Sequence, residues 1–220
     1  MKRTISILMA ILMTIGLTAC GNNEERVSND AVETIQAEGE QKAETTNENE
    51  DMSSKKTNNP QQTKGTLVVY FSATGTTKGV AEKIAAITGA DTYEIKAAQE
   101  YTDEDLNWSD SDSRSTKEQN DSSARPEIGS DAVSLDGYET IYIGFPIWWG
   151  EEPRIMDTFV ESYNFKGITM IPFCTSSSSG IERSGQNLAE QAGSGNWLDG
   201  KRFGAGASED EIRSWIDGLQ

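Results

Sequence analysis

Residues 66–87 read TLVVYFSATGTTKGVAEKIAAI, and this stretch decides the fold. Its first part, 66–71, is a short apolar run rich in β-branched side chains, which is typical of a strand buried on both faces. Its last part places Val80, Ile84 and Ile87 on one side of a helix. Hydroxyl side chains and Gly75 lie between the two, so the stretch predicts a strand, a tight turn and a helix in succession.

Strands and helices are predicted to alternate along the rest of the chain. Further strands are expected at 91–96, 139–145, 167–174 and, with a faint pattern, between Trp197 and Gly204. Further helices are expected behind Pro153, around Leu188 and after Ser208, which opens the capping box Ser208-Glu209-Asp210-Glu211. Such alternation predicts an α/β domain at 65–220 with three layers (α/β/α), in which a five-stranded parallel sheet is covered by helices on both faces.

One segment, residues 97–135, departs from this alternation. It is polar, weakly patterned and rich in Asp and Ser, which is unusual for a region that covers a sheet. A poor helix is expected around 103–120, and Ala124-Arg125-Pro126 is expected to be a loop. The sequence therefore leaves the packing of this segment undetermined.

The loop after the first strand has the composition of a phosphate site. In open parallel sheets, ligands bind at the carboxyl ends of the strands, where this loop lies. Hydroxyls, a glycine and the free amides of a helix N-terminus converge there, and together they suit a phosphate group. The residues concerned are Ser72, Thr74, Gly75, Thr76 and Thr77. The loop lacks the lysine pattern of a nucleoside triphosphate site, and the alternative is a Thr-capped helix after a tight turn.

The loop after the 139–145 strand contains two tryptophans, which core packing alone does not explain. We expect one of them to stack on a flat aromatic ligand and the other to pack under the following helix. The candidate binding residues are Pro146, Ile147, Trp148, Trp149 and Gly150.

The loop after the 167–174 strand consists of small polar residues. Such residues let the backbone approach a ligand and offer amide donors, although a polar connection without function is the alternative. The candidate binding residues are Thr175, Ser176, Ser177, Ser178 and Gly180.

Composition excludes several classes of function. The chain has no histidine, which excludes a His-dependent triad, His metal ligands and a His general base. Its two cysteines, Cys20 and Cys174, are too few for a zinc or iron–sulfur site in a chain without histidine, so no metal is predicted. The formal net charge is −17, and residues 65–220 carry −14 of it. A domain this acidic repels nucleic acid and favours a partner protein with a basic docking face.

The N-terminal residues indicate export and lipidation. Residues 1–20 have a basic start and an uncharged stretch too short to span a membrane, as in an export signal. The stretch ends in Leu17-Thr18-Ala19-Cys20-Gly21, which resembles the lipobox of bacterial lipoproteins, so Cys20 is the predicted lipidation site. Residues 21–64 are polar, lack aromatic residues and are predicted to be a disordered tether. The predicted location is the bacterial cell membrane, lipid-anchored on its extracytoplasmic side.

Taken together, the three loops resemble those of the flavodoxin family. The family's phosphate loop is similar to Ser72-Ala73-Thr74-Gly75-Thr76-Thr77, its second loop to 144–150, and its third to Phe173-Cys174-Thr175-Ser176 with Gly180. The resemblance implies noncovalent FMN, with the first loop on the phosphate and the other two beside the isoalloxazine. It also implies that Glu151 and Glu152 place negative charge near the ring.

The resemblance implies an electron-transfer flavoprotein anchored to the outer face of the membrane. No dedicated acid, base or nucleophile is apparent, which favours an electron carrier over an enzyme that turns over a substrate. The alternative is an NAD(P)H-dependent quinone or flavin reductase, because Phe145-Pro146-Ile147-Trp148-Trp149 also resembles the loop of the quinone reductases that share this fold. A third possibility is a surface-binding lipoprotein that has lost its flavin.

Overall fold

The computed structural model describes residues 65–219. The strands are β1 (Gly65–Phe71), β2 (Asp91–Ile95), β3 (Tyr138–Pro146), β4 (Thr169–Thr175), β5 (Asn196–Trp197) and β6 (Lys201–Phe203). The helices are α1 (Thr76–Thr88), α2 (Arg114–Asn120), α3 (Arg154–Glu161), α4 (Glu182–Ala192) and α5 (Glu209–Asp217). The predicted signal peptide, the lipidation site Cys20 and the tether lie outside the described residues. Within 65–219, no helix is both long enough and apolar enough to cross a membrane.

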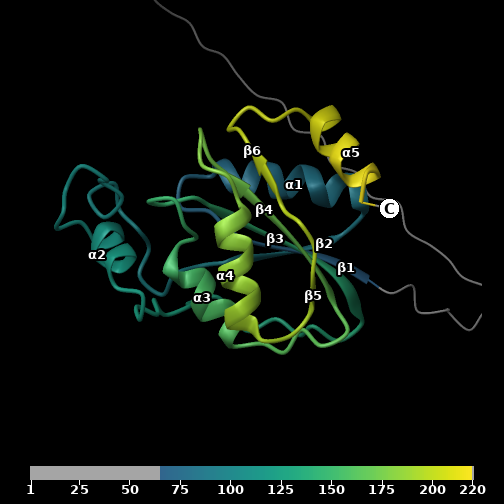
Figure 1. Cartoon of the computed structure of the whole chain (residues 1–220), viewed down its shortest axis with the longest axis horizontal. Helices are drawn as coiled ribbons and strands as arrows, with labels where there is room; N and C mark the ends of the chain where they lie inside the picture. Colours follow the sequence, from purple (N-terminus) through teal and green to yellow (C-terminus); the bar gives the residue numbers. More distant parts are fainter. Residues whose placement is uncertain (1–64, 220) are drawn as a thin grey trace, which may run out of the picture. The chain divides into compact units, whose positions relative to one another are not determined.

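The strands form one parallel sheet in the order β2-β1-β3-β4-β5, and β6 also pairs with β4 (Figure 1). Every pairing between these strands is parallel. Since β5 and β6 lie along the same edge of β4, the sheet has five strand positions. The predicted five-stranded parallel α/β fold is confirmed.

The faint pattern of the last strand has a structural cause in its neighbour. Pro172 lies in the middle of β4, opposite the gap between β5 and β6. The carbonyl of Met170 accepts from the Leu198 amide at 2.9 Å, so alternate residues of β4, Pro172 included, face this edge. Proline has no N–H to donate, so the ladder breaks there and the edge strand divides into two short pieces.

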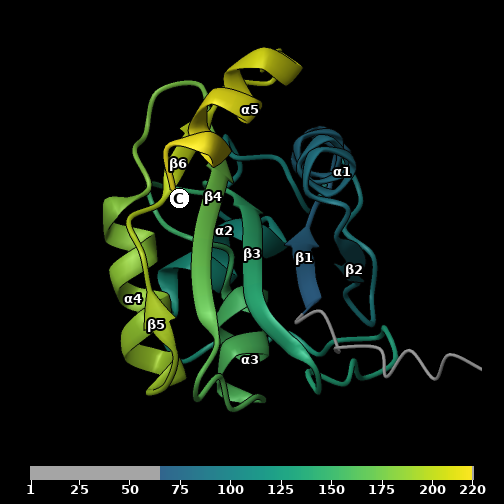
Figure 2. The same ribbon diagram turned by 90° about the vertical axis from the view of Figure 1, so that its right-hand side faces the viewer.

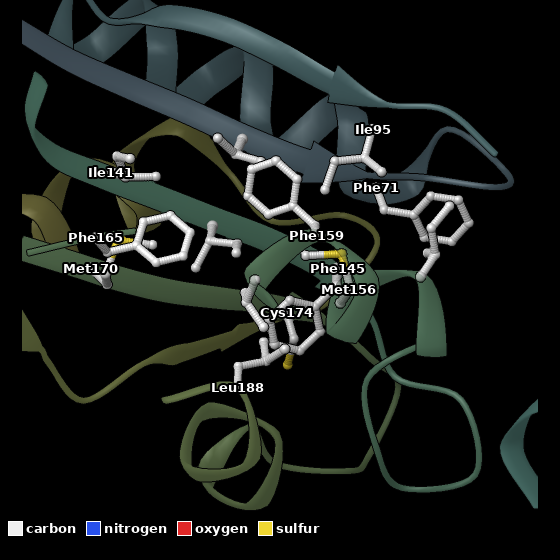
Figure 3. Packing of buried hydrophobic residues seen from close by; sticks show 14 of the residues in the cluster. Phe71, Ile95, Ile141, Phe145, Met156, Phe159, Phe165, Met170, Cys174 and Leu188 are labelled. Atoms are coloured by element: carbon white, nitrogen blue, oxygen red, sulfur yellow. The ribbon is translucent and has the colours of Figure 1, made fainter. Parts of the chain in front are cut away.

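The helices cover both faces of the sheet, as Figure 2 shows. Alternate residues of β1 enter two separate cores. Leu67, Val69 and Phe71 pack in the core beneath α3 and α4, whereas Val68 and Tyr70 pack in the core beneath α1 and α5. Figure 3 shows the first of these cores, in which side chains of α3 lie among those of β3 and β4. The short apolar run read in the sequence therefore reflects a strand buried on both sides.

The expected helix at 103–120 is only partly correct, because α2 begins at Arg114. The residues before it form turns closed by their own side chains. Asp105 accepts from the Thr102 amide at 3.0 Å, and Asp110 accepts from the Asp112 amide at 2.8 Å. Asp, Asn and Ser compete in this way with helical hydrogen bonds. The helix starts where Ser113 caps it by accepting from the Thr116 amide.

We call residues 99–126 the arm. Its base is closed by two backbone hydrogen bonds, from Ala98 N to the Glu127 carbonyl and from Gly129 N to the Lys96 carbonyl, both 2.8 Å. A Cβ on Gly129 would lie 2.7 Å from the Ala98 Cα, so only glycine allows this approach. The arm, with α2, projects beyond the carboxyl ends of the strands (Figure 1).

Candidate functional site

The three predicted loops meet at the carboxyl ends of β1, β3 and β4. The chain leaves β1 for β2 on one side and returns to β3 on the other, so the sheet has its topological switch point there. Two hydrogen bonds join the loops. The hydroxyls of Thr77 and Thr175 are buried and lie 2.7 Å apart, and the Ile147 amide donates to the Thr175 carbonyl at 3.1 Å. The structure therefore brings one member of each loop together.

The N-terminus of α1 is open. Gly75 precedes the helix with a φ of +84°, and no side chain among the described residues caps it. The alternative of a Thr-capped helix is therefore wrong, and the first amides of α1 keep the unpaired donors that every helix N-terminus has. The Ser72 hydroxyl beside them is buried and has no hydrogen-bond partner within 65–219. Unpaired donors at the positive end of a helix fit a phosphate group.

Loop 148–151 is a tight turn with unusual backbone angles. Trp148 and Glu151 exchange two backbone hydrogen bonds of 2.8 and 3.0 Å. The central residues, Trp149 and Gly150, have φ values of +50° and +84°, as in a type I′ turn. Gly150 adopts such angles freely, but Trp149 is the one non-glycine residue at positive φ in the described chain. Strain of this kind costs about 1–3 kcal/mol and is typical of functional sites.

One tryptophan packs and the other is more exposed, but the ring contacts of Trp148 are with β1 and the arm and not, as expected, with the helix that follows. The Trp148 ring packs edge-on against Phe71 and Tyr101, with centroid distances of 5.7 and 5.2 Å. Trp149 is 45% exposed. Trp149 is therefore the tryptophan that is free to stack on a ligand.

A cavity of about 440 Å³ adjoins this turn. Its size is that of a small-molecule site, and its lining carries no charged residue. The lining residues are Thr74, Ile147, Trp148 and Trp149 from the predicted loops, and Leu106, Trp108 and Ser115 from the arm. The three residues of the arm were not predicted from the sequence. Two apolar side chains, Leu106 and Trp108, in an otherwise polar segment were the signal that could have found them.

The third loop lies differently from what we expected. Residues 176–180 do not line this cavity. The Ser176 hydroxyl accepts from the amides of Ser178 and Ser179 at 3.2 and 2.9 Å, and Arg202 donates to the Ser176 carbonyl at 3.0 Å. Amide donors that we expected to face a ligand are thus used within the loop. As ligand contacts, the residues of all three loops stay predictions.

Gln119 of α2 fastens the arm to the turn. Its side-chain amide nitrogen donates to the carbonyl of Trp148 at 3.1 Å and to that of Glu152 at 3.2 Å. Carbonyls only accept, so the nitrogen of this amide must face them. Arg154 adds a second link, because one of its nitrogens donates to the Gln119 carbonyl at 3.2 Å and to the Glu151 carboxylate at 2.8 Å.

Contacts of the Tyr101 ring also hold the arm against the turn. The Tyr101 hydroxyl donates to Glu118 at 2.5 Å, and the Arg114 guanidinium lies 4.0 Å from the centre of the Tyr101 ring. Burial, followed by this hydrogen bond, raises the pKa of Tyr101 far above its usual range. Tyr101 therefore stays protonated and presents a neutral ring to Trp148.

The expectation that two glutamates place negative charge beside the ring is wrong for Glu152. That side chain is fully buried and accepts from Asn187 of α4 at 3.3 Å. Burial, with a smaller effect from the Asp157 carboxylate, raises the pKa of Glu152 to about 7. Glu151 remains near the surface of the turn, but ion pairs with Arg154 and Arg183 balance its charge.

Cys174 is not available to a ligand. It lies in β4 with no exposed surface, within the core beneath α3 and α4. Burial raises the pKa of its thiol to about 12. Cys174 is therefore a small core residue with a protonated, unreactive thiol.

The geometry defines an open parallel α/β protein with a ligand site at the carboxyl ends of β1, β3 and β4. The chain belongs to the flavodoxin family, since the family model described as flavodoxin matches residues 65–219. No curated protein matches the chain.

Solved structures agree with this assignment. A protein classed as a flavoprotein from Bacteroides uniformis is 47% identical, with a TM-score of 0.67, over 70% of this chain and 97% of the other. A similar protein from Bacteroides eggerthii is 43% identical, with a TM-score of 0.66 and the same coverage. A flavoprotein from Lactobacillus acidophilus, solved in complex with FMN, is 26% identical, with a TM-score of 0.54, over 70% of this chain and 99% of the other.

The contacts of Gln119 predict a local effect. Gln119→Met keeps the length of the side chain but removes both hydrogen bonds to the turn. We expect a free energy of unfolding lower by about 1 kcal/mol, because two hydrogen bonds of about 1 kcal/mol each are lost, while the buried side-chain oxygen of Gln119, which has no partner within 65–219, is removed as well. We also expect faster hydrogen exchange at the Trp148 and Glu151 amides. Gln186→Met, at an exposed site of α4, is the control and should change neither quantity. Unchanged exchange in Gln119→Met would show that the turn does not need this contact.

The raised pKa of Glu152 predicts a pH-dependent stability. The unfolded carboxyl loses its proton near pH 4.5, whereas the folded one keeps it up to about pH 7. Stability contributed by the protonated group is thus full below pH 4.5 and is lost as pH rises to 7. The side chain of Glu152→Gln is neutral at every pH. The free energy of unfolding of this variant should therefore exceed that of wild type by on the order of 1–3 kcal/mol at pH 8 and equal it at pH 4.5. Urea unfolding at both pH values measures this.

Glu161→Gln, at the end of the helix α3 that follows Glu152, is the matched control with the opposite sign. Glu161 forms two hydrogen bonds with Arg125, of 2.8 and 2.7 Å, which lower the pKa of this carboxyl. Its stabilising effect is present above its unfolded pKa and is lost as pH falls through the lowered folded pKa, so this variant should be less stable than wild type at pH 8, and the difference should disappear only below pH 4.5. If Glu152→Gln gained nothing at pH 8 relative to pH 4.5, the buried carboxyl would be charged in the native state.

Proposed function

We propose that this chain is an FMN-binding electron-transfer flavoprotein, held by lipidated Cys20 at the outer face of a bacterial membrane. The observation that carries the proposal is the open N-terminus of α1 beside the unpaired, buried hydroxyl of Ser72. A similar flavoprotein, that of Lactobacillus acidophilus, is known in complex with FMN. The phosphate of FMN is the group that would satisfy these donors here.

The residues present fit a noncovalently bound FMN. Ser72, Thr74, Thr76 and the first amides of α1 would hold the phosphate through hydrogen bonds at the positive end of the helix dipole. The uncharged cavity beside Ile147 and Trp149 suits the neutral ring system. Bound FMN would supply electron transfer in steps of one or two electrons, which no amino-acid side chain of this site provides.

The residues of the protein would orient the bound FMN and shield its ring from solvent. Trp149 presents an aromatic face, and Gly150 lets the backbone of the turn change direction at little cost, because it has no Cβ. None of the side chains that line the cavity is an acid, a base or a strong nucleophile. This favours electron carriage over the turnover of a substrate. The uncharged lining would also accept a quinone, so an NAD(P)H-dependent reductase of the same fold is the alternative.

The partner and the location follow from charge and from the N-terminal residues. Residues 65–220 carry a net charge of −14, which favours a redox partner with a basic docking face and opposes nucleic acid. The lipobox-like residues 17–21 support lipidation, and two acyl chains on one cysteine suffice for stable anchoring.

Comparing FMN with riboflavin tests the phosphate site. Ser72→Ala should lower the affinity for FMN about tenfold or more, because a hydrogen bond to a charged group is lost. Riboflavin, which has no phosphate, should bind the variant as it binds wild type. Ser214→Ala, at an exposed site of α5, is the control for the same change and should alter neither affinity. Flavin fluorescence during titration measures all three. Failure of wild type to bind FMN would contradict the proposal. If Ser72→Ala lost the same affinity for FMN and for riboflavin, the phosphate would not bind at this loop.

A further inference from the structure

Two large apolar side chains are exposed in the described part of the chain, and both line the same cavity. They are Trp108, 79% exposed on the arm, and Trp149, 45% exposed in the turn. Exposed tryptophans are uncommon in soluble domains unless they meet a ligand or a partner. The two come from segments about 40 residues apart in sequence, so only the fold brings them to one recess.

We propose that Trp108 is the outer wall of the ring site, so that the flat ring of the flavin is held between Trp108 of the arm and Trp149 of the turn. The identity of the ligand rests on the proposed function. The role of Trp108 as the outer wall is inferred from the cavity, whose lining residues come from the first two loops and the arm. The third loop carries no aromatic residue and contributes nothing to this lining.

The chemistry of the recess matches the ring and not the phosphate. Leu106, Trp108, Ile147 and Trp149 present apolar surface, and Thr74 and Ser115 add only hydroxyls. An uncharged, largely aromatic recess favours a neutral planar group that can stack. The phosphate donors of Ser72 and the start of α1 lie at the loop that contributes Thr74, so one molecule with a ring and a phosphate could occupy both.

The arm holds Trp108 in place through several hydrogen bonds. The Ser115 hydroxyl and amide both donate to the Asp105 carbonyl, at 2.6 and 3.0 Å, and draw the turn that precedes Trp108 onto α2. Gln119 then ties α2 to the turn of Trp149. The two walls of the recess are thus connected within the protein. A ring would enter a site that is already formed, which reduces the entropy lost on binding.

Trp108 variants test this wall. In the full chain, Trp108→Ala should lower the affinities for FMN and for riboflavin by the same factor, about threefold to tenfold, because both ligands carry the ring that stacks. Trp108→Phe should restore most of the affinity. Trp215→Phe, on α5 and packed against the core beneath it, controls for the loss of one tryptophan signal. Since Trp108 is so exposed, the thermal unfolding midpoint of Trp108→Ala should equal that of wild type.

A second measurement does not depend on flavin chemistry. In wild type, bound riboflavin should shield both Trp108 and Trp149 from acrylamide quenching, and Trp108→Phe should report one shielded tryptophan fewer. Unchanged affinity of Trp108→Ala for both flavins would overturn the inference. If wild type bound neither flavin, the proposed function and this inference would both fail, whereas loss of FMN binding alone in Ser72→Ala leaves the inference standing.

Discussion

The side-chain amide of Gln119 donates to two carbonyls, one on each side of the turn that carries Trp149 and Gly150. Much of the site depends on this contact. The turn places a tryptophan at positive φ, which is unfavourable for a bulky side chain, so surrounding contacts must hold it there. The same contact fixes the polar arm, which has few apolar residues of its own. One amide thus stabilises both the turn and the segment that faces it.

Charge is arranged so that the cavity stays neutral within an acidic domain. Glu151 is balanced by two arginines, and Glu152 is buried beneath α4 with a raised pKa. The net charge of residues 65–220 therefore acts as a field around the domain and not as a local charge at the ring. Such a field speeds encounter with a basic partner and weakens as salt screens it. Under the proposed function, the neutral lining would suit the flavin ring, and the acidic exterior would suit a basic partner.

Sequence reasoning predicted the elements whose pattern is local. The run from β1 into α1 could be predicted because strand, turn and helix each leave a signal within a few residues. Features that are determined by residues elsewhere in the chain could not be predicted in this way. The break between β5 and β6 depends on Pro172 of the neighbouring strand, and the burial of Glu152 depends on Asn187 of α4. Trp108 and Leu106 stand out as apolar residues in a polar segment, but they have no period, and only the fold shows which recess they line.

The central claim is that this chain carries electrons on bound FMN. A redox titration of the FMN-loaded protein, followed by visible absorption and repeated with NADH and NADPH as reductants, tests it most directly. The account predicts two separate one-electron steps and no oxidation of either nicotinamide. A single two-electron step driven by NADH or NADPH would contradict it and would identify the chain as a reductase of the same fold.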